Sequence, residues 1–302
     1  MKKTGFGWDF KAIFPGRYPN KERMFFVMSM PIGLQLYTVR DAMEQDFEGT
    51  LKKVKEFGYD GVEFAGLFGH TAAEVKNMCA EIGLTPISAH VPLDEMIAAP
   101  EEVLGVYKDI GCKYVVVPYL PEEKRAGTPA FAQTMADIEM LCKVAKSLGL
   151  VMLYHNHDFE FQKIDGKYVL DYMYDTIPAS LLQTELDTCW VNVGGENPAQ
   201  YVLKYTGRAP IVHLKDFVMQ GREKPQHLYE LIGIETDGQT AQDEAFGFRP
   251  VGSGVQDFPA ILAASEKAGA QWVIVEQDRP APGEEPVASA KKSIDYLRSF
   301  AW

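Results

Sequence analysis

The chain has 302 residues, 46% of them hydrophobic and 24% charged, which is typical of a soluble globular protein. Its net charge of −12 disfavours nucleic acid as a partner, because phosphate binding draws on clustered lysine and arginine. No apolar run approaches the roughly 18 residues that a membrane span needs, so we expect a cytoplasmic protein. The length suits one large barrel domain or two ordinary domains.

Residues 1–30 do not share the pattern of the remaining chain. They are rich in aromatic and basic residues without periodicity. Met24 to Met28 weakly resembles a signal peptide, but no small-residue cleavage site follows. We expect a peripheral N-terminal extension, with Met28 or Met30 as an alternative start, and a single domain over residues 31–302.

From residue 32 the chain alternates short apolar runs with amphipathic stretches that end at glycines, as expected of repeated β/α units around a parallel sheet. No GxGxxG motif follows the first run, which disfavours a dinucleotide-binding fold. The pattern therefore predicts an α/β protein with a closed (β/α)8 TIM barrel. The expected strands are 32–37, 61–64, 85–90, 113–118, 150–155, 182–187, 210–214 and 272–276. The expected helices are 47–57, 72–82, 101–110, 130–148 and 258–268.

One long irregular stretch, roughly residues 217–249, separates the seventh expected strand from the next helix. Long insertions at the C-terminal face of a barrel are often functional. We interpret this one as a lid over the pocket, with a solvated excursion or a contact in a homo-oligomer as alternatives.

Four cysteines are spread through the chain without CxxC spacing. This distribution disfavours a zinc ribbon or a redox motif and predicts free thiols in a reducing compartment.

Four residues that can bind a metal occur at or just beyond expected strand ends, namely Glu160, Asp187, His213 and Glu276. Gaps of 27 and 26 residues separate the first three, close to the roughly 30 residues of one β/α repeat. The C-terminal ends of barrel strands share one pocket. Carboxylates with one imidazole suit Mn²⁺, which we expect, with Mg²⁺, Co²⁺ or Zn²⁺ as alternatives.

Each of these four residues also has a structural alternative. Glu160 fits a solvated loop, and Asp187 fits the cap of a following helix. His213 fits a hydrogen-bonded core histidine, and Glu276 fits a buried ion pair. Their shared position within successive repeats is what favours the metal site.

Further polar residues are expected around the same pocket. Glu63 and His90 end the second and third expected strands, so His90 is a candidate substrate contact and Glu63 a candidate supporting partner. His155 and His157 flank the end of the fifth strand, where one could contact the substrate and the other could orient Glu160.

Three more candidates for substrate binding follow later in the chain. Lys215 could bind a substrate oxygen or form an ion pair. Arg249 precedes Gly252 and Gly254, whose lack of side chains would let a ligand approach. Trp190 could stack on a sugar face or pack in the core.

The chain resembles the sugar phosphate isomerase/epimerase group of the xylose-isomerase-like barrels over residues 32–300. The resemblance rests on six segments. They are 33–40 (Gly-Leu-Gln-Leu-Tyr-Thr-Val-Arg), 154–160 (Tyr-His-Asn-His-Asp-Phe-Glu), 185–188 (Glu-Leu-Asp-Thr), 212–216 (Val-His-Leu-Lys-Asp), 250–258 (Pro-Val-Gly-Ser-Gly-Val-Gln-Asp-Phe) and 275–278 (Val-Glu-Gln-Asp).

The resemblance implies that Glu160, Asp187, His213 and Glu276 bind one divalent ion, and that Glu160 and Glu276 act as acid and base on opposite faces of a small-molecule substrate. An epimerase or isomerase of a sugar or keto-polyol, working through a metal-stabilised enediolate, is the first hypothesis. The alternative is a metal-dependent lyase or dehydratase of a keto-inositol or 3-keto-glycoside.

Two further functions are weighed against these hypotheses. A barrel that binds sugar without turnover is the non-enzymatic reading. The apurinic endonucleases share this barrel, but they carry a histidine where this chain has Trp190, and only six histidines are present here. A DNA-cutting multi-metal site is therefore disfavoured.

Overall fold

A parallel β-barrel organises the protein. The computed structural model describes residues 30–219 and 246–300. Within them, eight parallel strands follow the order β3-β2-β1-β12-β9-β8-β5-β4. A bridge between His90 and Val116 joins the two outermost strands, β3 and β4, and closes the sheet into a barrel. The strands are β1 Ile32–Gln35, β2 Gly61–Phe64, β3 Thr85–Ala89, β4 Tyr114–Val117, β5 Val151–His155, β8 Leu182–Asp187, β9 Ile211–Leu214 and β12 Trp272–Val275.

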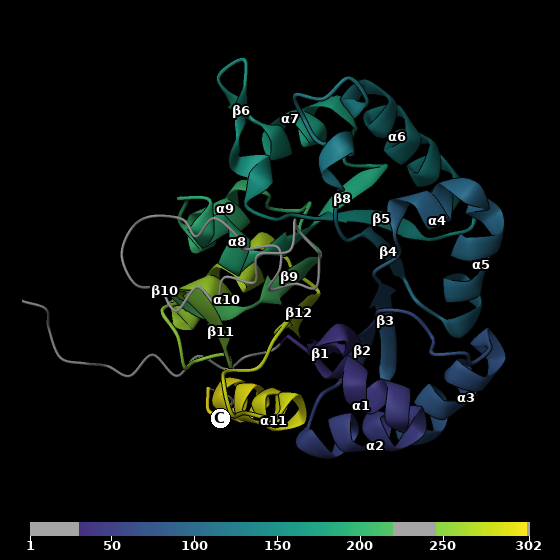
Figure 1. Ribbon diagram of the computed structural model, residues 1–302, viewed down its shortest axis with the longest axis vertical. Coiled ribbons are helices and arrows are strands. Elements are labelled where there is room, and N and C mark those ends of the chain that lie inside the picture. Colours follow the sequence, from purple (N-terminus) through teal and green to yellow (C-terminus); the bar gives the residue numbers. More distant parts are fainter. Residues whose placement is uncertain (1–29, 220–245, 301–302) are drawn as a thin grey trace, which may run out of the picture.

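Helices surround this barrel as an outer ring (Figure 1). All eight expected strands and all five expected helices are present, so the predicted TIM barrel is confirmed. The α-helices are α1 Arg40–Gln45, α2 Phe47–Phe57, α3 Ala72–Ile82, α4 Leu93–Ala98, α5 Pro100–Ile110, α6 Phe131–Ser147, α7 Val169–Thr176, α8 Thr188–Val193, α9 Pro198–Lys204, α10 Phe258–Ala268 and α11 Pro286–Arg298. Short 3₁₀ helices are η1 Leu36–Val39, η2 Glu122–Lys124 and η3 Phe159–Phe161.

Strand alternation divides the buried side chains into two sets. One set packs between the strands and the helices and forms the main hydrophobic core. The other fills the barrel interior, and we call its lower part the apolar layer. This layer consists of Ile87, Tyr114, Val116, Leu153, Ile211 and Ile274.

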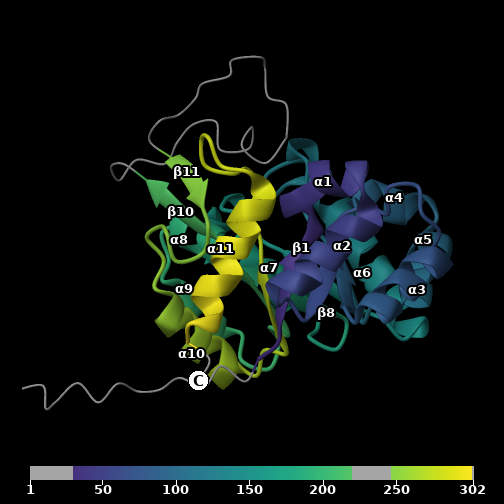
Figure 2. The ribbon, with the colours of Figure 1, turned by 90° about the horizontal axis from the view of Figure 1, so that it is seen from below.

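The two ends of the irregular stretch after β9 pair with each other as antiparallel strands. Strand β10 (Asp216–Met219) pairs antiparallel with β11 (Phe246–Arg249). Figure 2 shows both strands toward the end of the barrel that also carries α1 and α4. A second small hairpin joins β6 (Lys163–Ile164) to β7 (Lys167–Tyr168). The expected lid and the expected N-terminal extension lie mostly or wholly outside the described residues.

Two further sequence expectations concern thiols and membranes. Cys79, Cys112, Cys142 and Cys189 are free and buried, as predicted. No helix within residues 30–219 and 246–300 is both long enough and apolar enough to span a membrane.

Candidate metal centre and its cavity

Four side chains with metal-binding atoms meet at the C-terminal end of the barrel. They are His155, Asp187, His213 and Glu276, and one ligand atom of each lies within 4.8 Å of those of the others. His155 Nε2 is 3.4 Å from Asp187 Oδ2 and 3.6 Å from Glu276 Oε2. His213 Nδ1 is 3.2 Å from Glu276 Oε2. All four are buried.

Local structure positions the Asp187 carboxylate at the end of β8. Its Oδ1 accepts a hydrogen bond from the Trp190 backbone N–H at 3.0 Å and so caps α8. Its backbone is held by the Asn156 side chain, whose Oδ1 accepts from the Asp187 N–H at 3.0 Å. The predicted cap therefore exists, and it leaves Oδ2 directed at the imidazole of His155.

The expected ligand set changes at one position, because Glu160 lies elsewhere. Its carboxylate accepts hydrogen bonds from the Tyr154 hydroxyl and, at 2.8 Å, from the His157 backbone N–H. Tyr154 belongs to the core between strands and helices, whereas Leu153, one residue earlier, belongs to the apolar layer of the barrel. Alternation thus turns His155 inward, and η3 folds Glu160 back onto the outer side of β5. His155 occupies the place expected for Glu160.

Burial shapes the protonation of Glu160. It raises the pKa of this carboxyl to about 7, although the hydrogen bonds from Tyr154 and His157 oppose the change. Glu160 does not line the main cavity, so the predicted pairing of Glu160 with Glu276 across a substrate does not fit this geometry.

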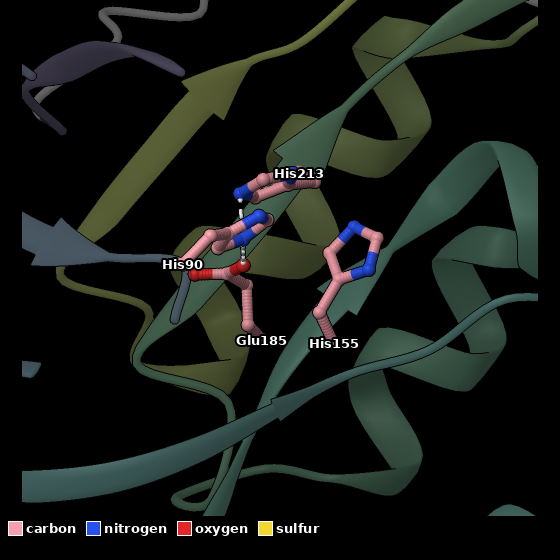
Figure 3. Close-up of side chains that lie close together, drawn as sticks. All are labelled: His90, His155, Glu185 and His213. Carbon is pink, nitrogen blue, oxygen red and sulfur yellow. Dashed lines mark hydrogen bonds and ion pairs between the residues drawn. The ribbon is translucent and has the colours of Figure 1, made fainter. Parts of the chain in front are cut away.

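A second polar cluster lies beside the first. His90 Nε2 is 2.5 Å from Glu185 Oε1, and His213 Nε2 is 3.1 Å from the same oxygen. Figure 3 shows His90, His155, Glu185 and His213 directed toward one another from different parts of the barrel wall. The cluster connects His90 to the imidazole of His213 through the Glu185 carboxylate.

Glu63 contacts the histidines of this cluster from the barrel interior. It accepts hydrogen bonds from Gln35 Nε2 at 2.7 Å and from Ser88 Oγ at 2.6 Å. Its Oε1 also lies 2.9 Å from His213 Nε2 and 3.1 Å from His90 Nε2. Glu63 therefore orients two imidazoles without lining the cavity itself.

Lys215 is a buried cation at the same end of the barrel. Its Nζ lies 2.7 Å from Asp278 Oδ2, 2.8 Å from Glu276 Oε2 and 3.5 Å from Asp187 Oδ2. Burial alone would lower the pKa of Lys215, but these carboxylates raise it well above its usual value. Lys215 in turn holds the pKa of Glu276 well below its usual range, against the effect of burial. Both groups are therefore charged at neutral pH.

The two histidines after β5 differ in protonation. Burial lowers the pKa of His157 well below its usual value, and the positive charges of His155 and Lys215 lower it further. Burial also disfavours charge on His155, but the nearby Asp187 and Glu276 carboxylates raise its pKa to about 9. His157 is thus a neutral imidazole at pH 7.

The first cluster fits a divalent metal ion. Neither ring nitrogen of His155 nor Asp187 Oδ2 has a hydrogen-bond partner among the described residues, although all three atoms are buried. Buried polar atoms without a hydrogen bond are costly, and a shared cation would satisfy them. Metal bonds of roughly 2.1 Å in a tetrahedron place neighbouring ligand atoms about 3.4 Å apart, close to the 3.2–3.6 Å observed for three of the ligand pairs. Two imidazoles and two carboxylates suit Zn²⁺, Mn²⁺ or Co²⁺ better than Mg²⁺.

A cavity of about 930 Å³ opens onto this cluster. Its polar end is lined by Tyr37, His90, His155, His157, Lys215, Glu276 and Asp278, and its other walls come mainly from α4, α5 and the loops after β2 and β4. The volume is near the upper end of the range for small-molecule sites. The predictions that His90, His155, His157 and Lys215 face one pocket agree with this lining.

Two expected substrate contacts, Arg249 and Trp190, do not line the cavity. Arg249 Nη1 donates to the backbone oxygen of Phe248 at 2.8 Å, and Arg249 does not line the cavity. Trp190 is fully buried, with its ring centroid 5.3 Å from that of His157 and 5.9 Å from that of Phe248. Trp190 therefore packs in the protein core, which was the alternative to stacking on a sugar.

The glycines after Arg249 serve the fold and leave no space for a ligand. A Cβ at Gly252, where φ is +88°, would lie 2.4 Å from the Tyr296 ring, and one at Gly254 would lie 2.3 Å from Asp216 Oδ1. Asp216 accepts hydrogen bonds from the backbone N–H groups of both glycines. The loop is therefore built around the Asp216 carboxylate.

Glu185 belongs to the second cluster and Asp278 contacts Lys215, although the sequence patterns did not predict them as site residues. Glu185 lies two positions before Asp187 on the same strand, so alternation alone would have sent both side chains into the barrel. Asp278 follows Glu276 by two, just beyond the end of β12, and only the contact with Lys215 reveals its role.

The comparisons with known proteins agree with this architecture. The family described as Xylose isomerase-like TIM barrel matches residues 51–300, and the chain belongs to this family. The chain is similar to the inosose dehydratase of Geobacillus kaustophilus (strain HTA426), with 23% identity over 271 residues, covering 82% of this chain and 85% of that protein.

Solved structures also share the fold. One is a sugar phosphate isomerase/epimerase from Parabacteroides distasonis ATCC 8503, with TM-score 0.72 and 23% identity, covering 90% of this chain and 100% of that one. Another is the IOLI protein with a binding zinc atom, with TM-score 0.66 and 17% identity, covering 90% and 98%.

Proposed function

We propose that this protein is a divalent-metal-dependent lyase that dehydrates a keto-inositol or eliminates the β-substituent of a 3-keto-glycoside. The observation that carries the proposal is the convergence of His155, Asp187, His213 and Glu276 next to a large cavity that His155 and Glu276 line. The similarity to an inosose dehydratase over most of the chain supports elimination over the epimerisation that the sequence motifs first suggested.

His155, Asp187, His213 and Glu276 would hold one divalent ion, which when bound would supply a Lewis acid for a substrate carbonyl. The IOLI protein shares this fold and its solved structure holds a zinc atom, which supports a divalent metal in the proposed function. We propose Mn²⁺, Co²⁺ or Zn²⁺, since two imidazoles contribute to the ligand set.

Removal of the proton from the carbon next to the carbonyl requires a base that is unprotonated at neutral pH. His157 lines the cavity as a neutral imidazole and satisfies this need. In the proposed reaction, His157 takes the proton from the carbon next to the carbonyl. The C–O bond at the following carbon then breaks, and the same proton passes to the departing oxygen. Water or an alcohol leaves, and no proton is gained or lost overall.

Two further groups position the substrate. The Lys215 ammonium is held 2.8 Å from Glu276 and faces the cavity, where it stabilises negative charge developing on a substrate oxygen. His90, tied to Glu185, is placed to contact a substrate hydroxyl.

An assay in deuterated water distinguishes elimination from epimerisation. The metal-loaded protein is incubated with a keto-inositol and with a methyl 3-keto-glucoside, and the products are read by NMR. Loss of water or methanol with a new carbon–carbon double bond supports the lyase. Deuterium at one carbon of an otherwise unchanged skeleton would instead establish an epimerase or isomerase.

A further inference from the structure

The cavity has two chemically distinct ends. The charged end holds the groups described above. The outer end is lined mainly by apolar side chains, namely Ala65, Leu67, Pro92, Leu93, Val103, Val106, Tyr107, Pro118, Tyr119 and Pro121. A keto-inositol carries an oxygen on every ring carbon and has no group that would cover such a wall.

Helix α5 builds much of this apolar wall. Val103, Val106 and Tyr107 are spaced so that they lie on one face of the helix, and all three line the cavity. Val103 and Val106 are half-buried. Leu93 at the start of α4 continues the same wall. An apolar surface left partly open beside a functional site indicates an apolar ligand group.

Tyr119 contributes a flat surface whose orientation is restrained by its neighbours. Its ring meets His157 edge-on at 5.1 Å and Phe159 edge-on at 5.6 Å. The guanidinium of Arg125 lies 5.0 Å from the ring centroid and donates to the Tyr119 hydroxyl. A restrained ring next to the candidate base suits stacking with a flat, aromatic group.

Charge at the outer end disfavours a phosphate. Asp94, Glu95 and Glu102 line it, and Asp94 is already paired with Lys124. Among the described residues that line the cavity, Lys215 is the one lysine, and carboxylates surround its ammonium group. A phosphorylated sugar would meet the negative charges of Glu95 and Glu102 here.

We propose that the outer end binds an aromatic aglycone, so that the substrate is a 3-keto-glycoside with a flat apolar group on its anomeric oxygen. This inference rests on the proposed lyase function. The proton leaves C2, the bond between C1 and the glycosidic oxygen breaks, and that oxygen takes up a proton. The products are a free alcohol or phenol and an unsaturated keto-sugar, and no oxidant is needed because the substrate already carries its ketone.

A pair of substrates with matched leaving groups tests the proposal. Benzyl and methyl alcohol have similar acidity, so benzyl and methyl 3-keto-glucosides differ mainly in the group that the outer end would bind. Burial of a phenyl ring predicts a kcat/KM about 10- to 100-fold higher for the benzyl compound. Equal values, or faster turnover of a 3-keto-glucose phosphate, would overturn the inference and leave the lyase function intact.

A matched pair of variants locates the effect. Val106→Asn on α5 should lower the ratio of kcat/KM for the benzyl compound to that for the methyl compound about tenfold. Val144→Asn on α6 is the control, because Val144 is also half-buried within a helix but lies outside the cavity. Unchanged benzyl selectivity in Val106→Asn, with both variants folded by circular dichroism, contradicts the proposal.

Calorimetry separates this inference from the proposed function. Unoxidised benzyl and methyl glucosides lack the ketone and cannot react, yet they probe the outer end directly. Tighter binding of the benzyl compound, lost in Val106→Asn and retained in Val144→Asn, supports the aglycone site even if no elimination is detected. Equal binding of the two glucosides counts against it.

Discussion

Two layers of the same barrel interior differ sharply in chemistry although the same strands build them. The apolar layer lies below, and the charged cluster lies at the C-terminal ends of the strands. On three strands, a residue of the apolar layer and a residue of the charged cluster are only two positions apart in the sequence. The pairs are Leu153 and His155, Ile211 and His213, and Ile274 and Glu276.

The difference separates stability from function. A filled apolar layer stabilises the barrel by burial and close packing. Buried charges without full pairing oppose folding, because the loss of hydration exceeds what imperfect contacts return. A cluster that breaks the packing rule at one end of otherwise regular strands is therefore a signature of a functional site.

Metal removal should produce the largest effect, and it should act on the charged layer alone. Excess chelator is expected to lower activity about a thousandfold, since a Lewis acid supplies several kcal/mol to the transition state. Added Mn²⁺ should restore the activity and, at a concentration 1,000 times Kd, raise the free energy of unfolding by about 4 kcal/mol. Activity that persists in chelator would contradict the metal mechanism.

Asp187→Asn is the matched variant for this experiment. The amide oxygen can still accept from the Trp190 N–H and cap α8, but the ligand charge is gone. Metal content by atomic absorption and the stabilisation by Mn²⁺ should both fall, while the metal-free protein stays folded. Normal metal content in this variant would remove Asp187 from the ligand set.

Leu153→Ala tests the apolar layer. Removal of a fully buried leucine should lower the free energy of unfolding by about 2–5 kcal/mol, because lost burial and a residual cavity add together. Chemical denaturation measures this change, and metal content should remain normal. The milder Ile274→Val should cost about 0.5–1.5 kcal/mol in the same layer. Loss of metal from either variant at a temperature where it is folded would show that the layers are not independent.

Glu160→Gln tests the outer side of β5, using metal-free protein so that the candidate ligands contribute no metal linkage. The pKa of Glu160 is about 7 in the folded state, against an ordinary value of 4.5. The stability that it contributes is present in full below pH 4.5 and is lost as pH rises through 7. Gln cannot titrate, so the stability of the variant relative to wild type should improve by about 3 kcal/mol between pH 4.5 and 7.5. A difference that stays constant with pH would refute the buried titration.

The regular part of the fold could be predicted closely from the sequence. Strand runs and the glycines that end helices are local signals, so β2 and α2 match the expected residue ranges. The short helices α8 and α9 were not expected, because six or seven residues carry too little periodicity. The antiparallel pairing of β10 with β11 is a contact across many residues and has no local signal.

Candidate ligands that lie at the ends of strands could be predicted from the sequence. The position of a residue in a turn beyond a strand could not. Asp187, His213 and Glu276 follow from strand ends and repeat spacing. Glu160 lies five residues beyond β5, so its direction depends on the η3 turn. The parity of β5 favours His155, since Leu153 and His155 share the inward side.

Arg249→Ala should have the smallest effect and thus marks the border of the site. The sequence motif around Arg249 suggested a position close to the barrel mouth. Its guanidinium instead donates a hydrogen bond to the Phe248 backbone oxygen, and the residue does not line the cavity. Substitution of a partly exposed residue of this kind changes the free energy of unfolding by about 0.5 kcal/mol or less. Because Arg249 does not line the cavity, kcat/KM should change by no more than about twofold. Steady-state kinetics on the preferred keto-substrate measures this. A tenfold or greater rise in KM with unchanged stability would mean that Arg249 reaches the substrate, and the polar end of the cavity would then extend to β11.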